Sequence, residues 1–211
     1  MKKYKKKRIN RKRKKNYFLS FVVMLLGLVM ILMVGTGMLF VKNILTNTVN
    51  YGVLDQEHKQ EFIQEIAPIA QRNYSQYRVL PSIVLGQAIL ESDWGRSELA
   101  SYNNLFGVKA GEHEDKVLFP TQEFVDNQWA TVNAYFKVYP TVEAAIIDHN
   151  RLFNEGVSWN TQLYHQVLAS KNYVEAAQAL QQAGYATDPD YASKIINVIE
   201  TYDLSKYDNN F

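Results

Sequence analysis

The sequence predicts a mainly helical domain that carries one small antiparallel β lobe and follows a single transmembrane helix. Three observations support this α+β fold class. A stretch without charge, residues 17–41, follows a strongly basic N-terminus. Apolar residues recur at helical spacing over most of the remaining chain. Residues 117–139 instead contain short aromatic and β-branched segments, which are typical of strands.

The N-terminal residues predict a single-pass membrane anchor. The first fifteen residues hold eleven Lys or Arg and no acid. As a helix, residues 17–41 would be roughly 37 Å long, enough to span a bilayer. This run is longer than that of a cleavable signal peptide and lacks its small-residue cleavage pattern. Because basic flanks stay in the cytoplasm, we expect a cytoplasmic tail (1–16), a retained anchor (17–41) and an extracellular remainder.

Charge and composition exclude several function classes. The whole chain has a net charge of +2, but residues 42–211 carry twelve Lys or Arg against 21 Asp or Glu. The basic tail is therefore a topology signal that also contacts anionic lipid, and we expect no nucleic-acid partner. The absence of cysteine excludes disulfides and thiol nucleophiles. The four histidines show no ligand spacing, so we expect no metal and no cofactor.

The first extracellular elements are a stalk and two helices. Residues 42–54 resemble a short stalk, and residues 55–211 suit one compact domain. Asp55 is expected to cap a helix from Gln56 to Tyr74, which Pro68 should kink or end early. Pro81 is expected to open the next helix, and Gly95 to close it. The nearly unbroken apolar sequence of this second helix predicts burial on almost all sides.

The β lobe and four further helices follow. The strand-like segments predict a hairpin or a three-stranded sheet with a turn at residues 126–128. Asn172 with Glu175 forms a capping-box-like pair, and Asp188-Pro189 is typical of the start of a helix. The four helices expected after the β lobe cover residues 141–154, 161–169, 173–183 and 189–202.

The stretch 87–95, Gln-Ala-Ile-Leu-Glu-Ser-Asp-Trp-Gly, sets one carboxylate, Glu91, at the end of an otherwise apolar helix. Desolvation between Leu90 and Trp94 would raise the pKa of Glu91, and the charge of Asp93 would raise it further. A carboxyl that stays protonated on a rigid helix end can donate a proton to a departing sugar oxygen. An isolated Glu at a helix end is more often simply solvated. Whether Glu91 is a catalytic acid therefore has to be judged from other segments of the sequence.

Four segments occur in an order that indicates a family. They are residues 81–95, Asn-Asn-Leu-Phe-Gly-Val-Lys at 103–109, Phe-Lys-Val-Tyr-Pro at 136–140 and Tyr-Ala-Thr-Asp-Pro-Asp-Tyr-Ala at 185–192. Together they resemble the bacterial endo-β-N-acetylglucosaminidases that cleave peptidoglycan, glycoside hydrolase family 73. The resemblance covers residues 57–204. It implies a lysozyme-like fold and hydrolysis of the β-1,4 bond after N-acetylglucosamine.

The resemblance also implies roles for individual residues. Glu91 matches the catalytic acid, Glu123 a second acid that acts as the base or aids it, and Tyr185 a tyrosine that helps to stabilise the reacting sugar. A distant base would imply inversion, whereas attack by the substrate's acetamido group would imply retention. Asn103 and Asn104 either line the site or hold their own loop. The predicted substrate-binding residues are Trp94, Tyr102, Asn103, Asn104, Tyr135 and Tyr191, of which the aromatic ones are also reasonable core residues.

We therefore expect a membrane-anchored autolysin that remodels the wall of a Gram-positive cell. Its partners would be peptidoglycan glycan strands and membrane lipid, and the stalk of ~13 residues would extend at most about 45 Å from the membrane. One alternative is a muramidase or a lytic transglycosylase on the same fold. The other is a non-catalytic scaffold that binds the wall, although the presence of both acids argues against it.

Overall fold

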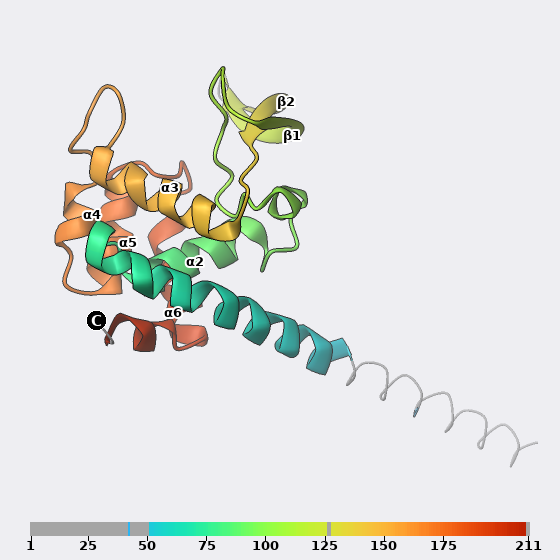
Figure 1. Ribbon diagram of the computed structural model, residues 1–211, viewed down its shortest axis with the longest axis vertical. Coiled ribbons are helices and arrows are strands. Elements are labelled where there is room, and N and C mark those ends of the chain that lie inside the picture. Colours follow the sequence, from blue (N-terminus) through green and yellow to red (C-terminus); the bar gives the residue numbers. More distant parts are fainter. Residues whose placement is uncertain (1–41, 43–50, 126–127, 210–211) are drawn as a thin grey trace, which may run out of the picture. The chain divides into compact units, whose positions relative to one another are not determined.

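The computed structural model describes residues 42, 51–125 and 128–209, with the backbone alone for 122–125 and 128–129. The chain divides into two compact units, residues 1–56 and 57–211. The second unit begins with helical residues 57–77. Its further elements are α2 (Pro81–Ser92), η1 (Glu98–Tyr102), β1 (Lys116–Val125), β2 (Gln128–Lys137), α3 (Val142–Glu155), α4 (His165–Ala169), α5 (Tyr173–Gln182), α6 (Tyr191–Thr201) and η2 (Leu204–Asn209) (Figure 1).

The predicted membrane anchor cannot be compared with the structure. The basic tail (1–16), the anchor (17–41) and most of the stalk (42–54) lie outside the described residues. Among the residues that are described, no helix combines the length and the apolar composition needed to cross a bilayer. The anchor therefore stays a prediction.

The first helix is longer than predicted. Residues 51–77 are all helical, so Asp55 is not its N-cap and Pro68 does not end it. Pro68 and Gln64 are both exposed, and the Gln64 carbonyl that loses its amide partner can bond to water instead. The core-facing side of this helix buries Phe62, Ile63, Ile66, Ala67 and Ala70.

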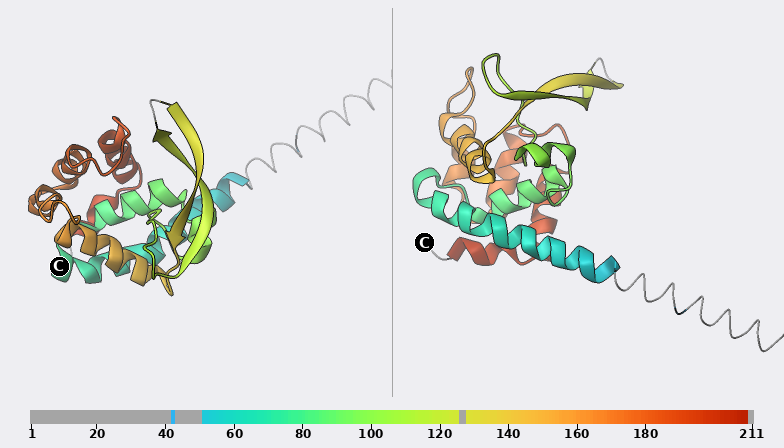
Figure 2. Two further views of the ribbon diagram at one scale, coloured as in Figure 1. Left: turned by 90° about the horizontal axis from the view of Figure 1, so that it is seen from above. Right: turned by 45° about the vertical axis from the view of Figure 1, so that its right-hand side comes forward.

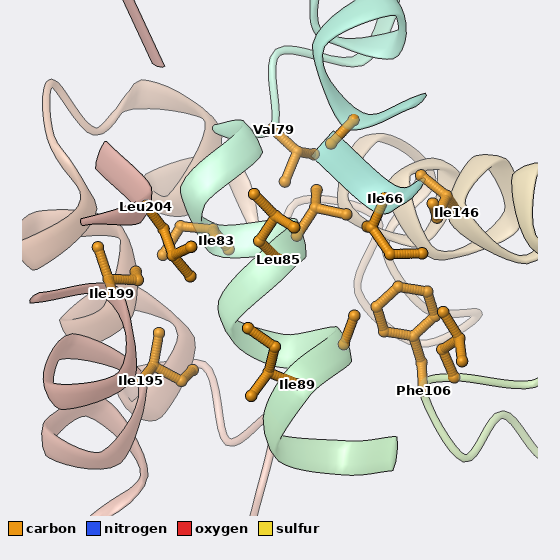
Figure 3. Close-up of a cluster of buried hydrophobic side chains, with 14 of the residues drawn as sticks. Ile66, Val79, Ile83, Leu85, Ile89, Phe106, Ile146, Ile195, Ile199 and Leu204 are labelled. Atoms are coloured by element: carbon orange, nitrogen blue, oxygen red, sulfur yellow. The ribbon is translucent and has the colours of Figure 1, made fainter. Parts of the chain in front are cut away.

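Helix α2 lies at the centre of the second unit. All of its residues except Leu90 and Glu91 are buried, as the apolar run predicted, and Pro81 opens it at the first helical position. It packs against α5, α6 and η2 (Figures 1 and 2). Figure 3 shows its apolar residues together with those of α6 in one core, including Ile83, Leu85, Ile89, Ile195 and Ile199.

Gly86 allows α2 and α6 to approach each other closely. A Cβ atom at this position would lie 3.2 Å from Cγ1 of Ile199 and 3.3 Å from Cγ2 of Ile195. Any larger residue would therefore push the two helices apart. The close packing sets the end of α2 beside the start of α6.

The β lobe is a two-stranded antiparallel hairpin. Its register runs from Lys116 opposite Lys137 to Val125 opposite Gln128, so Gln128 belongs to β2 and not to the predicted turn. Pro120 is tolerated within β1 because each strand of a two-stranded sheet has one unpaired side. The sequence-based alternative of a three-stranded sheet is wrong.

The later helices confirm the predicted order, with shifted ends. Oδ1 of Asn172 accepts a hydrogen bond from the Glu175 amide at 2.9 Å. Oε2 of Glu175 accepts one from the Lys171 amide at 2.9 Å, so the capping pair is reciprocal but reaches one residue further back than in a standard capping box. Helix α4 begins only at His165, after turns, and α6 begins two residues after Pro189.

Candidate active site

Glu91 lies one residue before the end of α2, and its side chain is hydrogen-bonded to Tyr191, the first residue of α6. Its Oε1 accepts a hydrogen bond from the Tyr191 hydroxyl at 2.8 Å. Nε2 of Gln87, one turn earlier on α2, donates to the same hydroxyl oxygen at 3.0 Å. Gln87 and Tyr191 are both buried. The carboxyl of Glu91 is thus held by a chain of two neutral side chains.

The surroundings of Glu91 favour its protonated form. The residue is exposed, yet the protein packed around its carboxyl desolvates it, and this desolvation raises the pKa above the ordinary 4.5. The hydrogen bond from Tyr191 acts in the opposite direction, because it stabilises the carboxylate. Asp93, expected to raise the pKa further, is not among the causes; it is exposed, where water screens its charge.

A sharp turn follows Glu91. Asp93, Trp94 and Gly95 have φ values of 48°, 62° and 72°, three left-handed residues in succession. Oγ of Ser92 accepts a hydrogen bond from the Gly95 amide at 2.8 Å. A Cβ at Gly95 would lie 3.0 Å from Cε2 of Phe62, so both the backbone angle and the space favour glycine here. The turn directs Trp94 back into the helical core.

Trp94 was predicted to line a saccharide groove, but the structure places it in the core. Its side chain is 8% exposed. The ring packs edge-on against Phe62 at 6.1 Å and against Tyr202 at 4.6 Å, and Nζ of Lys59 lies 5.4 Å from its centroid. The contacts of Trp94 therefore support the turn after Glu91.

The two asparagines predicted to bind substrate form hydrogen bonds to backbone groups. Asn103 ends η1 at a φ of 57°, and its Nδ2 donates to the Tyr139 carbonyl at 2.8 Å. Asn104 is buried, and its Nδ2 donates to the carbonyls of Val108 at 2.9 Å and Lys137 at 3.0 Å. Its Oδ1 accepts from the Val108 amide at 3.0 Å. Asn104 thus holds its own loop, which is one of the two sequence-based alternatives, and both side chains tie that loop to the end of β2 or to the segment that follows it.

Tyr185 joins Glu91 and Tyr191 at the site. Its ring stacks on that of Tyr191 with the centroids 5.6 Å apart and an interplanar angle of 19°. Burial raises its pKa, so the hydroxyl stays protonated. Within the described part of the chain this hydroxyl forms no hydrogen bond. It is therefore available to a sugar oxygen.

Buried rings support Tyr185 from behind. His149 is 2% exposed, stacks on Phe106 at 3.9 Å and contacts the Tyr185 ring edge-on at 6.3 Å. Burial lowers the pKa of His149 to about 4, so the ring is neutral near pH 7. In the described residues no group of three or more His, Asp or Glu side chains is placed to hold a metal ion.

The hairpin carries the remaining predicted residues. Glu123 lies on β1 opposite Ala130, and strand alternation puts it on the same face as Phe119. The Phe119 ring packs edge-on against Tyr102 at 5.8 Å. Tyr135 belongs to the opposite face and is 52% exposed. Nζ of Lys116 lies 5.2 Å from the centroid of the Tyr135 ring. Tyr102 and Tyr135 therefore do not line one groove.

Sequence reasoning missed Gln87, which fixes Tyr191 and through it Glu91. Its position four residues before Glu91 places both side chains on one face of α2, and this spacing was the available signal. Of the predicted catalytic and binding residues, the structure brings together Glu91, Tyr185 and Tyr191.

Known proteins resemble this chain over the same region. Residues 67–204 match the family described as mannosyl-glycoprotein endo-β-N-acetylglucosaminidase. Exo-glucosaminidase LytG of Bacillus subtilis is 50% identical over 153 residues, which cover 72% of this chain and 54% of LytG. A probable N-acetylmuramidase of Lactococcus lactis subsp. lactis is 34% identical over 152 residues, or 71% of this chain and 35% of that protein.

A solved structure shares the fold. The catalytic domain of the autolysin Auto from Listeria monocytogenes is 37% identical, covers 72% of this chain and 88% of its own, and gives a TM-score of 0.67. The chain spans about half the length of LytG and about a third of the lactococcal protein.

Proposed function

The chain belongs to the mannosyl-glycoprotein endo-β-N-acetylglucosaminidase family, and we propose that it is a peptidoglycan hydrolase that cleaves the β-1,4 bond after N-acetylglucosamine. The observation that carries this proposal is the state of Glu91. Its carboxyl lies at the accessible end of a buried helix, its pKa is raised by desolvation, and Tyr191 fixes its position. These are the properties required of a proton donor to a glycosidic oxygen.

In the proposed mechanism the two oxygens of Glu91 have different tasks. Oε1 accepts from Tyr191, so Oε2 is left to carry the proton toward the glycosidic oxygen. When that proton leaves, Glu91 becomes a carboxylate, and the bond from Tyr191 stabilises this charge. The unpaired Tyr185 hydroxyl, stacked beside Tyr191, binds an oxygen of the reacting sugar.

Glu123 is the second acid of the proposed mechanism. It lies on β1, an element separate from α2. If Glu123 activates a water molecule, the product anomer is inverted; if the substrate's acetamido group attacks, the configuration is retained. Proton NMR of the first anomer formed distinguishes these two routes.

Cleavage within the strand is the mode that the family name describes, and we propose it for this chain. The similarity to an exo-glucosaminidase favours a second mode, release from the strand end. Products of many lengths from long purified strands support internal cleavage. Short products alone, from the first minutes of digestion, support release from an end.

The basic tail and the uncharged run at residues 17–41 support a membrane-anchored form with the hydrolase domain outside the membrane. Such an anchor would confine cleavage to wall close to the membrane. Protease treatment of intact cells tests it: the domain should be cut while the protein fractionates with the membrane. Recovery of the full chain in the soluble fraction would contradict the anchor.

The test of activity is digestion of purified peptidoglycan by the detergent-solubilised full-length chain, followed by borohydride reduction and mass spectrometry. We expect reduced N-acetylglucosamine ends from the wild type and from Glu98→Gln, a control at an exposed Glu of η1. Glu91→Gln should give none. Reduced N-acetylmuramic acid ends would indicate a muramidase, anhydro-muramic ends a lytic transglycosylase, and binding without cleavage a scaffold.

A further inference from the structure

Four side chains, which we call the base cluster, join the foot of the hairpin to α3. They are Lys137 at the end of β2, Tyr139 just after it, Glu114 in the loop before β1, and Asp148 on α3. Lys137 and Tyr139 belong to the 136–140 segment that the family resemblance includes, but the sequence assigned no role to any of the four. They lie outside the group formed by Glu91, Tyr185 and Tyr191, so a role for them must be sought elsewhere in the reaction.

Lys137 is the centre of the base cluster. Its Nζ lies 2.8 Å from Oε1 of Glu114 and 2.9 Å from Oδ2 of Asp148. The Tyr139 hydroxyl donates to the same Asp148 oxygen at 2.7 Å. The side chains of Lys137 and Asp148 are 20% and 24% exposed, so this ion pair is sheltered from solvent and more specific in geometry than an exposed pair.

Both members of the pair are held in their charged forms. Desolvation acts to raise the pKa of Asp148, but the hydrogen bonds from Lys137 and Tyr139 outweigh it, and the pKa is lowered. Desolvation acts to lower the pKa of Lys137, yet its bonds to Glu114 and Asp148 raise it overall. The cluster is therefore a fixed set of charges near neutral pH.

Other contacts attach the hairpin to the loop before it and to η1, including the Tyr102–Phe119 ring contact and the bond from Nδ2 of Asn104 to the Lys137 carbonyl at 3.0 Å. The two strands pair extensively with each other, and none of the described helices packs broadly on either strand (Figures 1 and 2). The Lys137 amide donates to the Val108 carbonyl at 3.0 Å, and the Val138 amide to the Asp115 carbonyl at 2.9 Å. These bonds fix the foot to its own loop, whereas Lys137 and Tyr139 reach α3 through Asp148.

Distance from the foot amplifies any change of angle there. Glu123 lies seven residues beyond Lys116 on β1, about 24 Å along an extended strand. A tilt of about 10° at the foot would move the backbone of Glu123 by about 4 Å at that strand length. Displacements of this size greatly exceed what a reacting group tolerates.

We propose that Lys137 and Asp148 are positioning residues, which hold the hairpin at the angle at which Glu123 reaches the sugar bound at Glu91. This inference rests on the proposed function, in which Glu123 is the second acid. Lys137 and Asp148 bond to each other, to Glu114 and to Tyr139, and no bond joins either of them to Glu91, so the proposal routes their effect on catalysis through Glu123.

The experiment measures kcat and KM of the full-length chain on a soluble glycan strand of defined length. We expect Lys137→Met to lower kcat about tenfold, a loss within the range for a misplaced reacting group. Lys137→Arg, which keeps the charge, should restore most of the rate. Lys206→Met removes an exposed ion pair with Asp203 at η2, an element that packs on α2 and α6, and should leave kcat unchanged.

A double-mutant cycle separates positioning from general damage. If Lys137 acts through Glu123, Lys137→Met should lower kcat in the wild type but not in a Glu123→Gln background. An equal loss in both backgrounds, or no loss in either, would overturn the proposal. So would a Glu123→Gln variant as active as the wild type, while an inactive Glu91→Gln would leave the proposed function standing.

Thermal unfolding controls for folding. If Lys137→Met fails to fold, Asp148→Asn takes its place in the cycle, because an amide oxygen can still accept from Lys137 and Tyr139 while the charge is lost. The effect of Asp148→Asn on kcat is then compared in the wild type and in the Glu123→Gln background, with the same outcomes supporting or overturning the proposal.

Discussion

The helical body and the hairpin hold their acids in different ways. Glu91 ends a helix whose other residues, apart from Leu90, are buried, and its two partners along the hydrogen-bonded chain are neutral. Glu123 lies on a two-stranded hairpin whose foot is held by charged side chains. Packing sets the environment of the first acid, whereas ion pairs set the angle of the element that carries the second.

This difference corresponds to what each acid has to do. A proton donor needs a raised pKa, and uncharged neighbours in a desolvating site provide it. A second acid needs to arrive at the right distance from a bound sugar, which depends on the geometry of its element. In the proposed mechanism the body therefore sets the protonation of the first acid, and the foot of the hairpin sets the position of the second.

The largest contrast should come from removing each acid in turn. Glu91→Gln should lower kcat about 10³-fold or more, because no other group can donate the proton. Glu123→Gln should lower it about 100-fold, since the substrate's acetamido group can replace part of its role. Initial rates of N-acetylglucosamine end formation give both values. Equal losses would remove the distinction between the two regions.

Aromatic residues of the two regions should differ in how much they contribute to the free energy of unfolding. Trp94→Ala should lower the free energy of unfolding by about 3–5 kcal/mol, because it opens a cavity beside Phe62 and Tyr202. Tyr135→Ala, at an exposed hairpin position, should change it by less than about 0.5 kcal/mol. Urea unfolding followed by circular dichroism measures both. A small effect of Trp94→Ala would contradict its place in the core.

Tyr191→Phe tests the link between α2 and α6. It removes the hydroxyl between Gln87 and Glu91 and leaves Nε2 of Gln87 buried without a partner, so we expect a loss of about 1–2 kcal/mol in stability. It also removes the bond that lowers the pKa of Glu91. Because the donor must be protonated, activity falls as pH rises through that pKa, and the fall should move to higher pH. A move to lower pH in the pH profile of kcat would contradict the assignment.

Asp208→Ala should affect stability alone. Oδ1 of Asp208 accepts from the Ser82 amide at 2.8 Å and Oδ2 from the Ser82 hydroxyl at 2.6 Å, so the C-terminal end of the described chain caps α2. Losing this cap should lower the free energy of unfolding by about 1 kcal/mol and leave kcat unchanged. Asp208→Asn, which keeps one acceptor oxygen for the Ser82 amide, is the matched control. Equal unfolding midpoints for all three proteins would exclude the capping role.

Local patterns predicted the helical body well. Pro81 at a helix start, the unbroken apolar run after it and the Asn172–Glu175 pair are features of neighbouring residues, and each appears in the structure. The raised pKa of Glu91 also followed from its immediate neighbours and from the apolar helix that carries it. Pro68 misled the prediction because its effect depends on exposure, which local sequence does not specify.

Contacts between residues far apart in the chain could not be predicted from the sequence. Tyr191 and Glu91 are 100 residues apart and Asp208 and Ser82 are 126 apart, and no local pattern pairs them. Trp94 could not be assigned to the core in advance, since an aromatic ring serves packing and sugar binding equally well. Only the succession of left-handed residues at 93–95, a property of the folded backbone, directs it inward.

The central claim is that the helical body keeps Glu91 protonated for donation. A ¹³C NMR titration of the full-length chain with labelled glutamate tests it, with Glu91 assigned by comparison with Glu91→Gln. We predict a Glu91 pKa above the ordinary 4.5, with Glu91 gaining its proton at a higher pH than an ordinary exposed glutamate. A pKa at or below 4.5 would contradict the account of Glu91 as the general acid.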